Sequence, residues 1–502
     1  MYTFSSKLKT FSFVLMIVGI LGIGYGFLTA PKDIHEVEAM LKAEEAEHHG
    51  SGHKAANEHE VKADEATHES HAEPIVDSTL SEKRVDSVAH DTALAAKTAG
   101  HTEEAVESHA EVVANKAHDN NASAEHDDHK EHAEHVLHQL QNKPWAALYV
   151  ACLFVMLISL GALAFYAIQQ VAQAGWSPVL FRVMQGVTSY LLPGSIIFFV
   201  LLLCSGFHLN HLFVWMNDGV TEVGHENYDH MIAGKSGYLN FPFWIIRAIL
   251  FLTVWNLYRY YSRKNCLAQD EANDNSFYKK NFKLSAAFLV FFIVSESIMS
   301  WDWIMSVDPH WFSTLFGWYV FASFFVSGIT VIQMVTIYLK SKGYLENVNS
   351  SHIHDLSKFM FGISVFWTYL WFSQFMLIWY SNIPEEVTYF KTRIEHFNLP
   401  FFGAVFLNFI FPILLLINTD FKRVFWIIVM AGIIILFGHY VDFFNMIMPA
   451  TVGDRWFIGI PEIASILFFV GLFIFVVFSA LTKAPLVPKR NPFIEESKHF
   501  HY

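Results

Sequence analysis

The sequence SESIMSWDWIMSVDPHWFSTLFGWY, residues 295–319, joins two long apolar runs at 283–304 and 314–339. A membrane-spanning helix takes about 20 mostly apolar residues, and both runs reach that length. Between and within them the chain carries four ionisable groups: Glu296, Asp302, Asp308 and His310. The pattern predicts two membrane-spanning helices joined by a short polar turn at one membrane face.

The rest of the chain repeats this alternation of apolar runs and short polar connections. Hydrophobic residues make up 53% of the 502 residues and charged residues only 16%, whereas a soluble domain carries roughly 25% charged residues. Ten apolar segments are long enough to span a bilayer: 11–29, 145–169, 182–207, 241–262, 283–304, 314–339, 357–381, 400–418, 423–447 and 460–481. We therefore predict an all-α polytopic membrane protein with ten transmembrane helices.

Two of these segments admit a second interpretation. The third is interrupted by Pro193 and Gly194. The first follows Lys7 and Lys9, as a secretory signal would, but its apolar core is long and the following LTAP is a poor cleavage site. We expect the first segment to remain as a helix.

Lys and Arg gather in alternate connections between the segments. The loop at 262–283 is the richest, and the short connections on the opposite side hold few basic residues. The positive-inside rule then places both termini in the cytoplasm, and ten crossings also require both termini on one side. Residues 295–319 accordingly lie at the outer face.

The segment 30–144 differs in kind from the rest of the chain. It holds 26 acidic and 10 basic residues and no aromatic residue. Such a segment cannot bury enough apolar surface to offset its conformational entropy. We interpret it as a disordered or loosely helical insert on the outer side.

This insert also contains 16 of the 27 histidines. Five of them recur every third residue: His126, His129, His132, His135 and His138. Helix neighbours at this spacing can share a metal ion. Without cysteines or a fixed turn between the ligands, a polar low-complexity linker remains the simpler interpretation.

The sequence encodes no recognisable redox or nucleotide-binding motif. Its three cysteines form no CxxC or CxxCH pattern, and neither a P-loop nor a dinucleotide fingerprint is present. The basic residues mark a membrane face rather than a nucleic-acid site. Any electron transfer must use centres that other chains supply.

Ionisable groups within the apolar segments are functional candidates, because an unpaired charge in a bilayer costs several kcal/mol. Glu296 and Asp302 lie in the fifth segment, and His439 and Asp442 lie three apart on one face of the ninth. With Asp308 and His310 they form the predicted proton or quinol path. Secondary candidates are His208, His211 and Glu462.

Each candidate also has a structural interpretation. Glu462 after Pro461 suits a helix start, and Asp308-Pro309 suits a turn. His208 and His211 suit a membrane interface, or a haem b site if a facing helix supplied a ligand. His439 with Asp442 is the hardest to explain structurally.

The stretch DWIMSVDPHWFSTLFGWYVF, residues 302–321, resembles the signature of the ActF-type membrane subunit of alternative complex III, a bacterial quinol:electron-acceptor oxidoreductase. The family form has Glu at the position of Asp308, a charge-preserving difference. The resemblance covers about residues 145–481 and implies a fold similar to the membrane subunit of polysulfide reductase. That fold has two four-helix bundles flanked by one helix at each end.

We expect five parts in this chain. They are an N-terminal transmembrane helix, the polar insert, two bundles, and a last helix with a cytoplasmic tail: 1–29, 30–144, 145–304, 305–447 and 448–502. The polar insert lies outside the resemblance. The resemblance also implies a bacterial inner-membrane location.

The implied partners are an outer-side iron–sulfur subunit, haem c subunits, a sister membrane subunit of the same fold and, in many complexes, a terminal oxidase. The chain would bind no covalent cofactor. Menaquinol would be the electron donor, and iron–sulfur clusters and haem c would lie in the partners. The sister subunit is usually favoured as the quinol site, and this subunit is more often associated with proton handling.

Two other functions stay open. A stand-alone secondary transporter would have paired broken helices near the midplane, and the sequence shows one clear break, at Pro193-Gly194, without an obvious counterpart. A purely structural scaffold for the complex is the third possibility.

Overall fold

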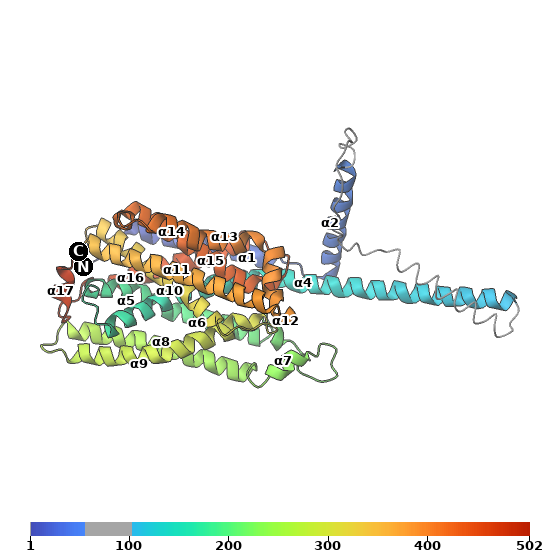
Figure 1. Cartoon of the computed structure of the whole chain (residues 1–502), viewed down its shortest axis with the longest axis horizontal. Helices are drawn as coiled ribbons and strands as arrows, with labels where there is room; N and C mark the ends of the chain where they lie inside the picture. Colours follow the sequence, from blue (N-terminus) through green and yellow to red (C-terminus); the bar gives the residue numbers. More distant parts are fainter. Residues whose placement is uncertain (1, 56–102, 502) are drawn as a thin grey trace. The chain divides into compact units, whose positions relative to one another are not determined.

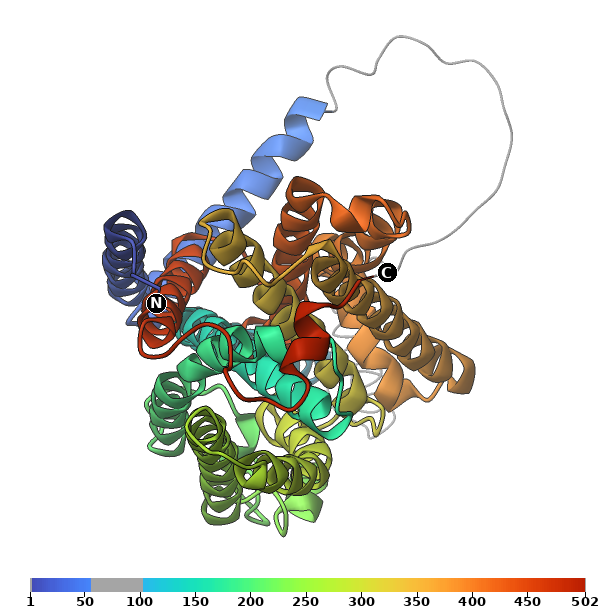
Figure 2. The ribbon, with the colours of Figure 1, turned by 90° about the vertical axis from the view of Figure 1, so that its left-hand side faces the viewer.

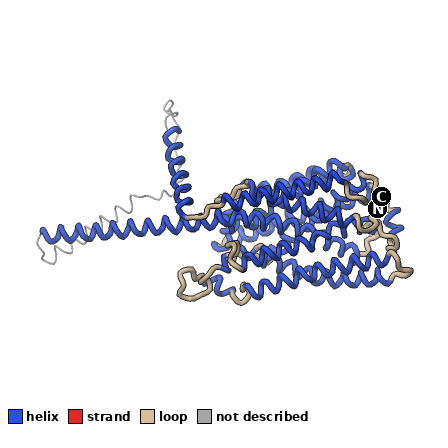
Figure 3. The backbone as a smooth tube through the Cα atoms, turned by 180° about the vertical axis from the view of Figure 1, so that it is seen from behind, coloured by secondary structure: helices blue, strands red, loops and turns tan. Residues whose placement is uncertain are grey.

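The computed structural model describes residues 2–55 and 103–501. Within these ranges the regular structure is entirely helical, with no strand (Figure 3). Ten of the helical segments are long and apolar enough to cross a membrane, as the sequence predicts. By contacts the chain forms two units, 1–30 with 139–502, and 31–138.

The ten spans follow one another along the first unit (Figure 1). They are α1 (Ser6–Thr29), the end of α4 (Glu103–Val171), α5 (Phe181–Val187) with α6 (Leu191–Gly206), α8 (Phe241–Gln269), α9 (Ser276–Trp303), α10 (Phe316–Ser341), α11 (Ser350–Ser381), α13 (Asn398–Val405) with α14 (Phe411–Leu416), α15 (Phe425–Val452) and α16 (Ile460–Leu481). Three short helices lie between or after them: α7 (His230–Lys235), α12 (Pro384–Glu395) and α17 (Ile494–Lys498).

The spans pack as two groups of four with the first and last helices side by side. Contacts join α4, α6, α8 and α9 in one group and α10, α11, α13–α14 and α15 in the other. Helices α1 and α16 share an extensive contact at one edge (Figure 2). This is the two-bundle arrangement with a flanking helix from each end of the chain.

Both chain ends lie at the same end of this unit. The Thr3 hydroxyl is 3.0 Å from the Tyr344 hydroxyl, and Asn349 Nδ2 donates to the Phe500 carbonyl oxygen at 2.5 Å. The loop between α10 and α11 thus contacts both termini, which agrees with an even number of crossings.

The second unit contains α2 (Ile34–Ala55) and the first part of α4. Residues 56–102 of the polar insert lie outside the described residues. The second span does not begin at residue 145, because α4 starts at Glu103 and continues through Pro144. Ala, Glu and Lys are strong helix formers, so nothing before Pro144 ends the helix.

The third span breaks just before its proline. A short 3₁₀ turn, Thr188–Tyr190, separates α5 from α6, and Pro193 lies in the first turn of α6. A proline cannot donate to the carbonyl four residues earlier and clashes with it. In a first turn that loss costs little, so the break forms upstream of Pro193.

The eighth span contains an irregular turn that sequence periodicity does not show. It is helical from Asn398 to Leu416, but a π-helical turn, Phe406–Ile410, lies directly before Pro412. The turn carries buried Asn408, whose amide has no hydrogen-bond partner in the described structure. A Cβ atom on Gly438 of α15 would lie 2.2 Å from Asn408 Oδ1, so glycine leaves room for this amide.

The bundles meet where α4 and α10 approach closely. A Cβ on Gly161 would lie 2.4 Å from the Phe324 carbonyl oxygen, and one on Gly328 would lie 2.6 Å from the Ala162 nitrogen. Membrane helices associate through such small-residue contacts, since lipid gives little hydrophobic driving force. This contact fixes α10 between the first bundle and α15.

Gly328→Ala should lower the stability of the full chain by about 1–3 kcal/mol, because the added methyl group overpacks the α4–α10 contact. Gly362→Ala on α11 is the matched control, since no atom lies within 4 Å of its Cβ position. Thermal unfolding in detergent should show a lower midpoint for Gly328→Ala alone. Equal midpoints for both variants would contradict the close contact.

Candidate functional site

Asp302 near the end of α9 forms a closed ion pair with a residue that sequence analysis missed. Arg247 of α8 donates from Nε to Oδ2 at 2.6 Å and from Nη2 to Oδ1 at 2.8 Å. The Tyr238 hydroxyl also donates to Oδ1 at 2.8 Å. Both charged side chains are buried, with the carboxylate 0% exposed.

Further contacts hold both residues of the Asp302–Arg247 pair. Arg247 stacks over the Tyr238 ring at 4.0 Å, and Trp244 donates its indole N–H to the Asp302 carbonyl at 2.8 Å. A bidentate pair of this kind is strong and geometrically specific. These contacts favour a structural role for Asp302, fixing the start of α8 to the end of α9.

Glu296 lies about 1.7 turns earlier on α9 and is 2% exposed. Its Oε1 accepts from the neighbouring Ser297 hydroxyl at 2.9 Å, and its Oε2 has no partner among the described residues. No hydrogen bond or ion pair in the described part of the chain joins Glu296 to Asp302 or to His439. The two α9 carboxylates are therefore not one connected pair.

Asp308 and His310 lie in the turn that follows α9, beside α7. His310 Nε2 is 2.6 Å from Asp229 Oδ2, and Lys235 Nζ donates to the Pro309 carbonyl at 2.5 Å. The hydrogen bond from His310 lowers the pKa of Asp229, and partial burial lowers the pKa of Lys235. His310 thus links the turn to α7 through Asp229, and Asp308 is half-buried in the same turn.

The secondary candidates occupy boundary positions. His208 is exposed in the left-handed region with φ 56°, and the His211 backbone N–H donates to Asn142 Oδ1 at 3.0 Å. Glu462 Oε2 accepts from the Gly459 N–H at 2.9 Å in the first turn of α16. The Glu462 contact is that of a helix-capping residue.

His439 and Asp442 of α15 form a buried network with α10 and α11. Ser323 Oγ is 2.8 Å from His439 Nδ1 and donates to Asp442 Oδ2 at 3.0 Å. Trp367 donates its indole N–H to the same oxygen at 2.9 Å, and the Tyr319 hydroxyl donates to Oδ1. His439 Nε2 has no partner within the described residues.

The hydrogen bonds of this network fix its proton positions. The Ser323 hydroxyl donates its one hydrogen to Asp442. In its contact with His439 the hydroxyl oxygen must therefore be the acceptor, which places an N–H on Nδ1. Nε2 is then free to accept a proton. No Lys or Arg contacts the Asp442 carboxylate in the described structure, so neutral donors and one imidazole surround it. This distinguishes Asp442 from Asp302.

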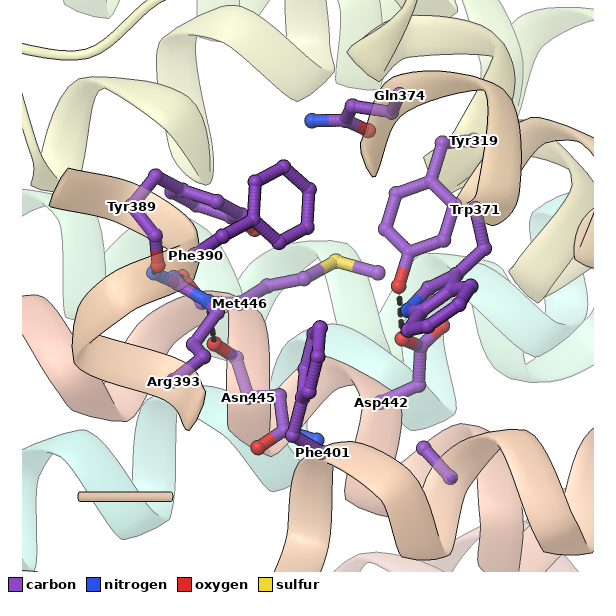
Figure 4. A pocket seen from close by; sticks show the side chains of 11 residues that line it. Tyr319, Trp371, Gln374, Tyr389, Phe390, Arg393, Phe401, Asp442, Asn445 and Met446 are labelled. Atoms are coloured by element: carbon purple, nitrogen blue, oxygen red, sulfur yellow. Dashed lines mark hydrogen bonds between the residues drawn. The ribbon is translucent and has the colours of Figure 1, made fainter. Parts of the chain in front are cut away.

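A small cavity of about 10 Å³ adjoins this network. Figure 4 shows Asp442 and Tyr319 on one side of it and Tyr389 with Arg393 on the other. A space of this size holds about one water molecule, and its polar walls can bind one.

Arg393 of α12 is a functional candidate that sequence analysis treated only as a loop charge. It is 3% exposed and donates to the carbonyl oxygens of Asn445 and Tyr389, at 3.0 and 2.8 Å. Burial lowers the pKa of Arg393 and raises the pKa of Tyr389. Its guanidinium stacks over the Tyr389 ring at 3.3 Å, and no described carboxylate forms an ion pair with it.

The turn after α9 covers this group. Trp311 stacks on Tyr389 with ring centroids 3.9 Å apart, and Asp308 lies close enough to interact electrostatically with Arg393. The cavity beside Asp442 is thus followed, towards this turn, by Tyr389, Arg393 and Asp308. An isolated arginine in a short amphipathic helix gives no sequence signal of this.

The repeated histidines of the insert do not form a metal site in the part of the chain that is described. No group of three potential ligands occurs there. His132, His135 and His138 lie on α4, and the side chains of His126 and His129 fall outside the described residues.

Comparison with known proteins adds no relative: no family model matches the chain, and no curated protein matches it.

Arg247→Gln should destabilise the full chain by about 3–5 kcal/mol, because it leaves the Asp302 carboxylate buried without its cation. The double variant Arg247→Met/Asp302→Leu should regain much of this loss, since it removes both charges. Thermal midpoints in detergent compare the three proteins. A wild-type midpoint for Arg247→Gln would show that the pair does not hold these helices.

Proposed function

We propose that this chain is the ActF-type membrane subunit of a quinol-oxidising respiratory complex, alternative complex III, in a bacterial inner membrane. Its own task is to transfer protons near the outer face through His439, Ser323 and Asp442. The observation that carries this proposal is the buried Asp442 carboxylate, which neutral donors and one imidazole surround. The family named in this proposal rests on the resemblance of residues 302–321 to the ActF-type signature.

The relay moves one proton without moving heavy atoms. A proton that arrives at His439 Nε2 makes the imidazole cationic. The Nδ1 proton then passes to Ser323 Oγ, and the Ser323 hydroxyl proton passes to Asp442 Oδ2. The result is a neutral imidazole, an unchanged serine and a protonated Asp442, so the charges balance.

The outward step uses the cavity beside Asp442. A water molecule there would lie next to Asp442 and Tyr319 on one wall and Arg393 on the other. The Arg393 cation disfavours an excess proton resting in the cavity, and the Asp308 carboxylate near it, in the half-exposed outer turn, offsets this charge and is the proposed proton acceptor. His310 and Asp229 lie beyond it at the surface.

The same cavity does not fit a quinol headgroup, because its volume of about 10 Å³ holds about one water. We therefore derive no step through quinol in this chain. Quinol oxidation belongs to the proposed sister membrane subunit, and electrons pass to the iron–sulfur and haem c partners. Glu296, which is not joined to the relay by any described bond, has no assigned step.

A second candidate function is a stand-alone secondary transporter. The observation that favours it is one irregular helical turn in a span of each bundle, the 3₁₀ turn Thr188–Tyr190 and the π-helical turn Phe406–Ile410. Such transporters commonly bind their substrate at interrupted helices near the midplane. Purification from native membranes distinguishes the two: haem c and iron–sulfur subunits would accompany a respiratory subunit, and a transporter would purify without them.

Asp442→Asn should leave the complex assembled but slow quinol oxidation, or the proton release coupled to it, by about 100-fold or more, because a positioned proton carrier contributes at least that much. Ser323→Ala should also slow these rates, because it removes the hydroxyl that links His439 to Asp442. Steady-state turnover and outer-side pH change measure both rates.

Glu462→Gln is the matched control, since that buried carboxylate caps a helix outside the relay. It should keep the wild-type rate. An assembled Asp442→Asn complex with unchanged turnover and proton release would refute the proton role of Asp442.

Both termini and the connection between α8 and α9, residues 270–275, should be cytoplasmic, with the polar insert outside, because basic residues concentrate on the side of the termini. In a background that lacks Cys152, Cys204 and Cys266, a cysteine at Ser276 should be protected from an impermeant reagent in intact cells. A cysteine at Ser51 should be labelled. The reverse labelling pattern would overturn this orientation.

A further inference from the structure

An open groove of about 520 Å³ lies between α6 and α8. Most of its lining is aliphatic or aromatic: Leu192, Ile196, Phe199, Val200, Ile249 and Leu257. Ile196, Val200 and Ile249 each expose about half of their surface in the chain alone. The groove therefore offers an apolar channel on the outside of the first bundle, at the depth where lipid chains lie.

The groove ends at an arginine that the protein leaves without a partner. Arg259 lines it, its Nε is buried without a hydrogen bond, and none of the described residues gives its guanidinium an ion pair. Asn256, one turn earlier, donates to Ser195 Oγ at 3.0 Å, while its own Oδ1 has no partner. Unpaired polar groups at an apolar channel indicate an amphipathic ligand.

The charges around Arg259 favour an anionic ligand. Arg263, one turn further along α8, interacts electrostatically with both Arg259 and Arg182. Arg182 is paired with Asp270 at 2.6 Å, and Arg263 donates to the carbonyl oxygens of Gln185 and Ala480. Neither neighbour supplies an anion to Arg259, so the local field is positive.

The position of Arg259 along α8 matches the depth at which lipid headgroups lie. Arg259, Tyr260 and Tyr261 lie in the second half of α8, which ends on the side of both chain termini. Tyrosines and arginines concentrate where the hydrocarbon meets the headgroups. The apolar residues of the groove continue from there towards the membrane centre.

We propose that this groove binds one anionic phospholipid from the leaflet on the side of the termini. Its phosphate contacts Arg259, and one acyl chain lies along the apolar residues of α6 and α8. The site is independent of the relay at Asp442, because it lies in the other bundle.

Native mass spectrometry of the delipidated full chain, titrated with phosphatidylglycerol or phosphatidylcholine, tests this site. The wild type should retain one phosphatidylglycerol more tightly than phosphatidylcholine. Arg259→Gln should weaken phosphatidylglycerol binding about fivefold, since one basic residue at the surface contributes about that factor. Ile196→Trp, which fills the groove without changing charge, should weaken both lipids.

Lys283→Gln on α9 is the matched control, because this lysine is exposed at the same end of the unit but does not line the groove. It should leave the tight phosphatidylglycerol bound. Equal loss in Arg259→Gln and Lys283→Gln would reduce the effect to general surface charge and overturn the site. A menaquinone that competes with phosphatidylglycerol and whose binding is also lost in Ile196→Trp would identify a quinone as the occupant instead and overturn the lipid assignment.

Discussion

The free-energy cost of a charge in an apolar interior governs the polar chemistry of this protein. An isolated ion there costs several kcal/mol, so each buried ionisable group must find a counter-ion, lose its charge or bind several dipoles. Asp302 meets the requirement with Arg247, through two short hydrogen bonds. Asp442 meets it with Tyr319, Ser323, Trp367 and an imidazole. Asp302 is thus held in a closed ion pair, whereas Asp442 is held by neutral donors and an imidazole whose Nε2 has no partner among the described residues.

Packing between the bundles positions the hydrogen-bond network around Asp442. The glycine contact between α4 and α10 fixes α10 against the first bundle, and the opposite face of α10 presents Tyr319 and Ser323 to Asp442. Gly438 on α15 accepts the π-helical turn of the eighth span, one residue before His439. A π-helical turn often marks a functional site. The relay therefore rests on close helix contacts on two sides of the second bundle.

Sequence patterns predict the ten spans because each apolar run is long and bounded by charges. They also single out His439 with Asp442, since three-residue spacing puts both on one helix face. They do not reveal Arg247 as the partner of Asp302, because that pairing joins residues 55 positions apart in different spans. Nor do they reveal Arg393 beside the cavity, since its burial depends on Trp311 in the turn after α9 and on Asn445 of α15. Local pattern thus predicts helices and faces, while partners between helices require the packed structure.

Proton exchange at Asp442 is the central claim, and infrared difference spectroscopy tests it most directly. The full chain in lipid nanodiscs would be stepped between neutral and acidic pH, in H₂O and in D₂O. We expect a carboxylic-acid C=O band that appears on acidification, shifts in D₂O, is absent in Asp442→Asn and persists in Glu462→Gln. A difference spectrum identical in the wild type and in folded Asp442→Asn would show that Asp442 does not exchange its proton, and would contradict the relay.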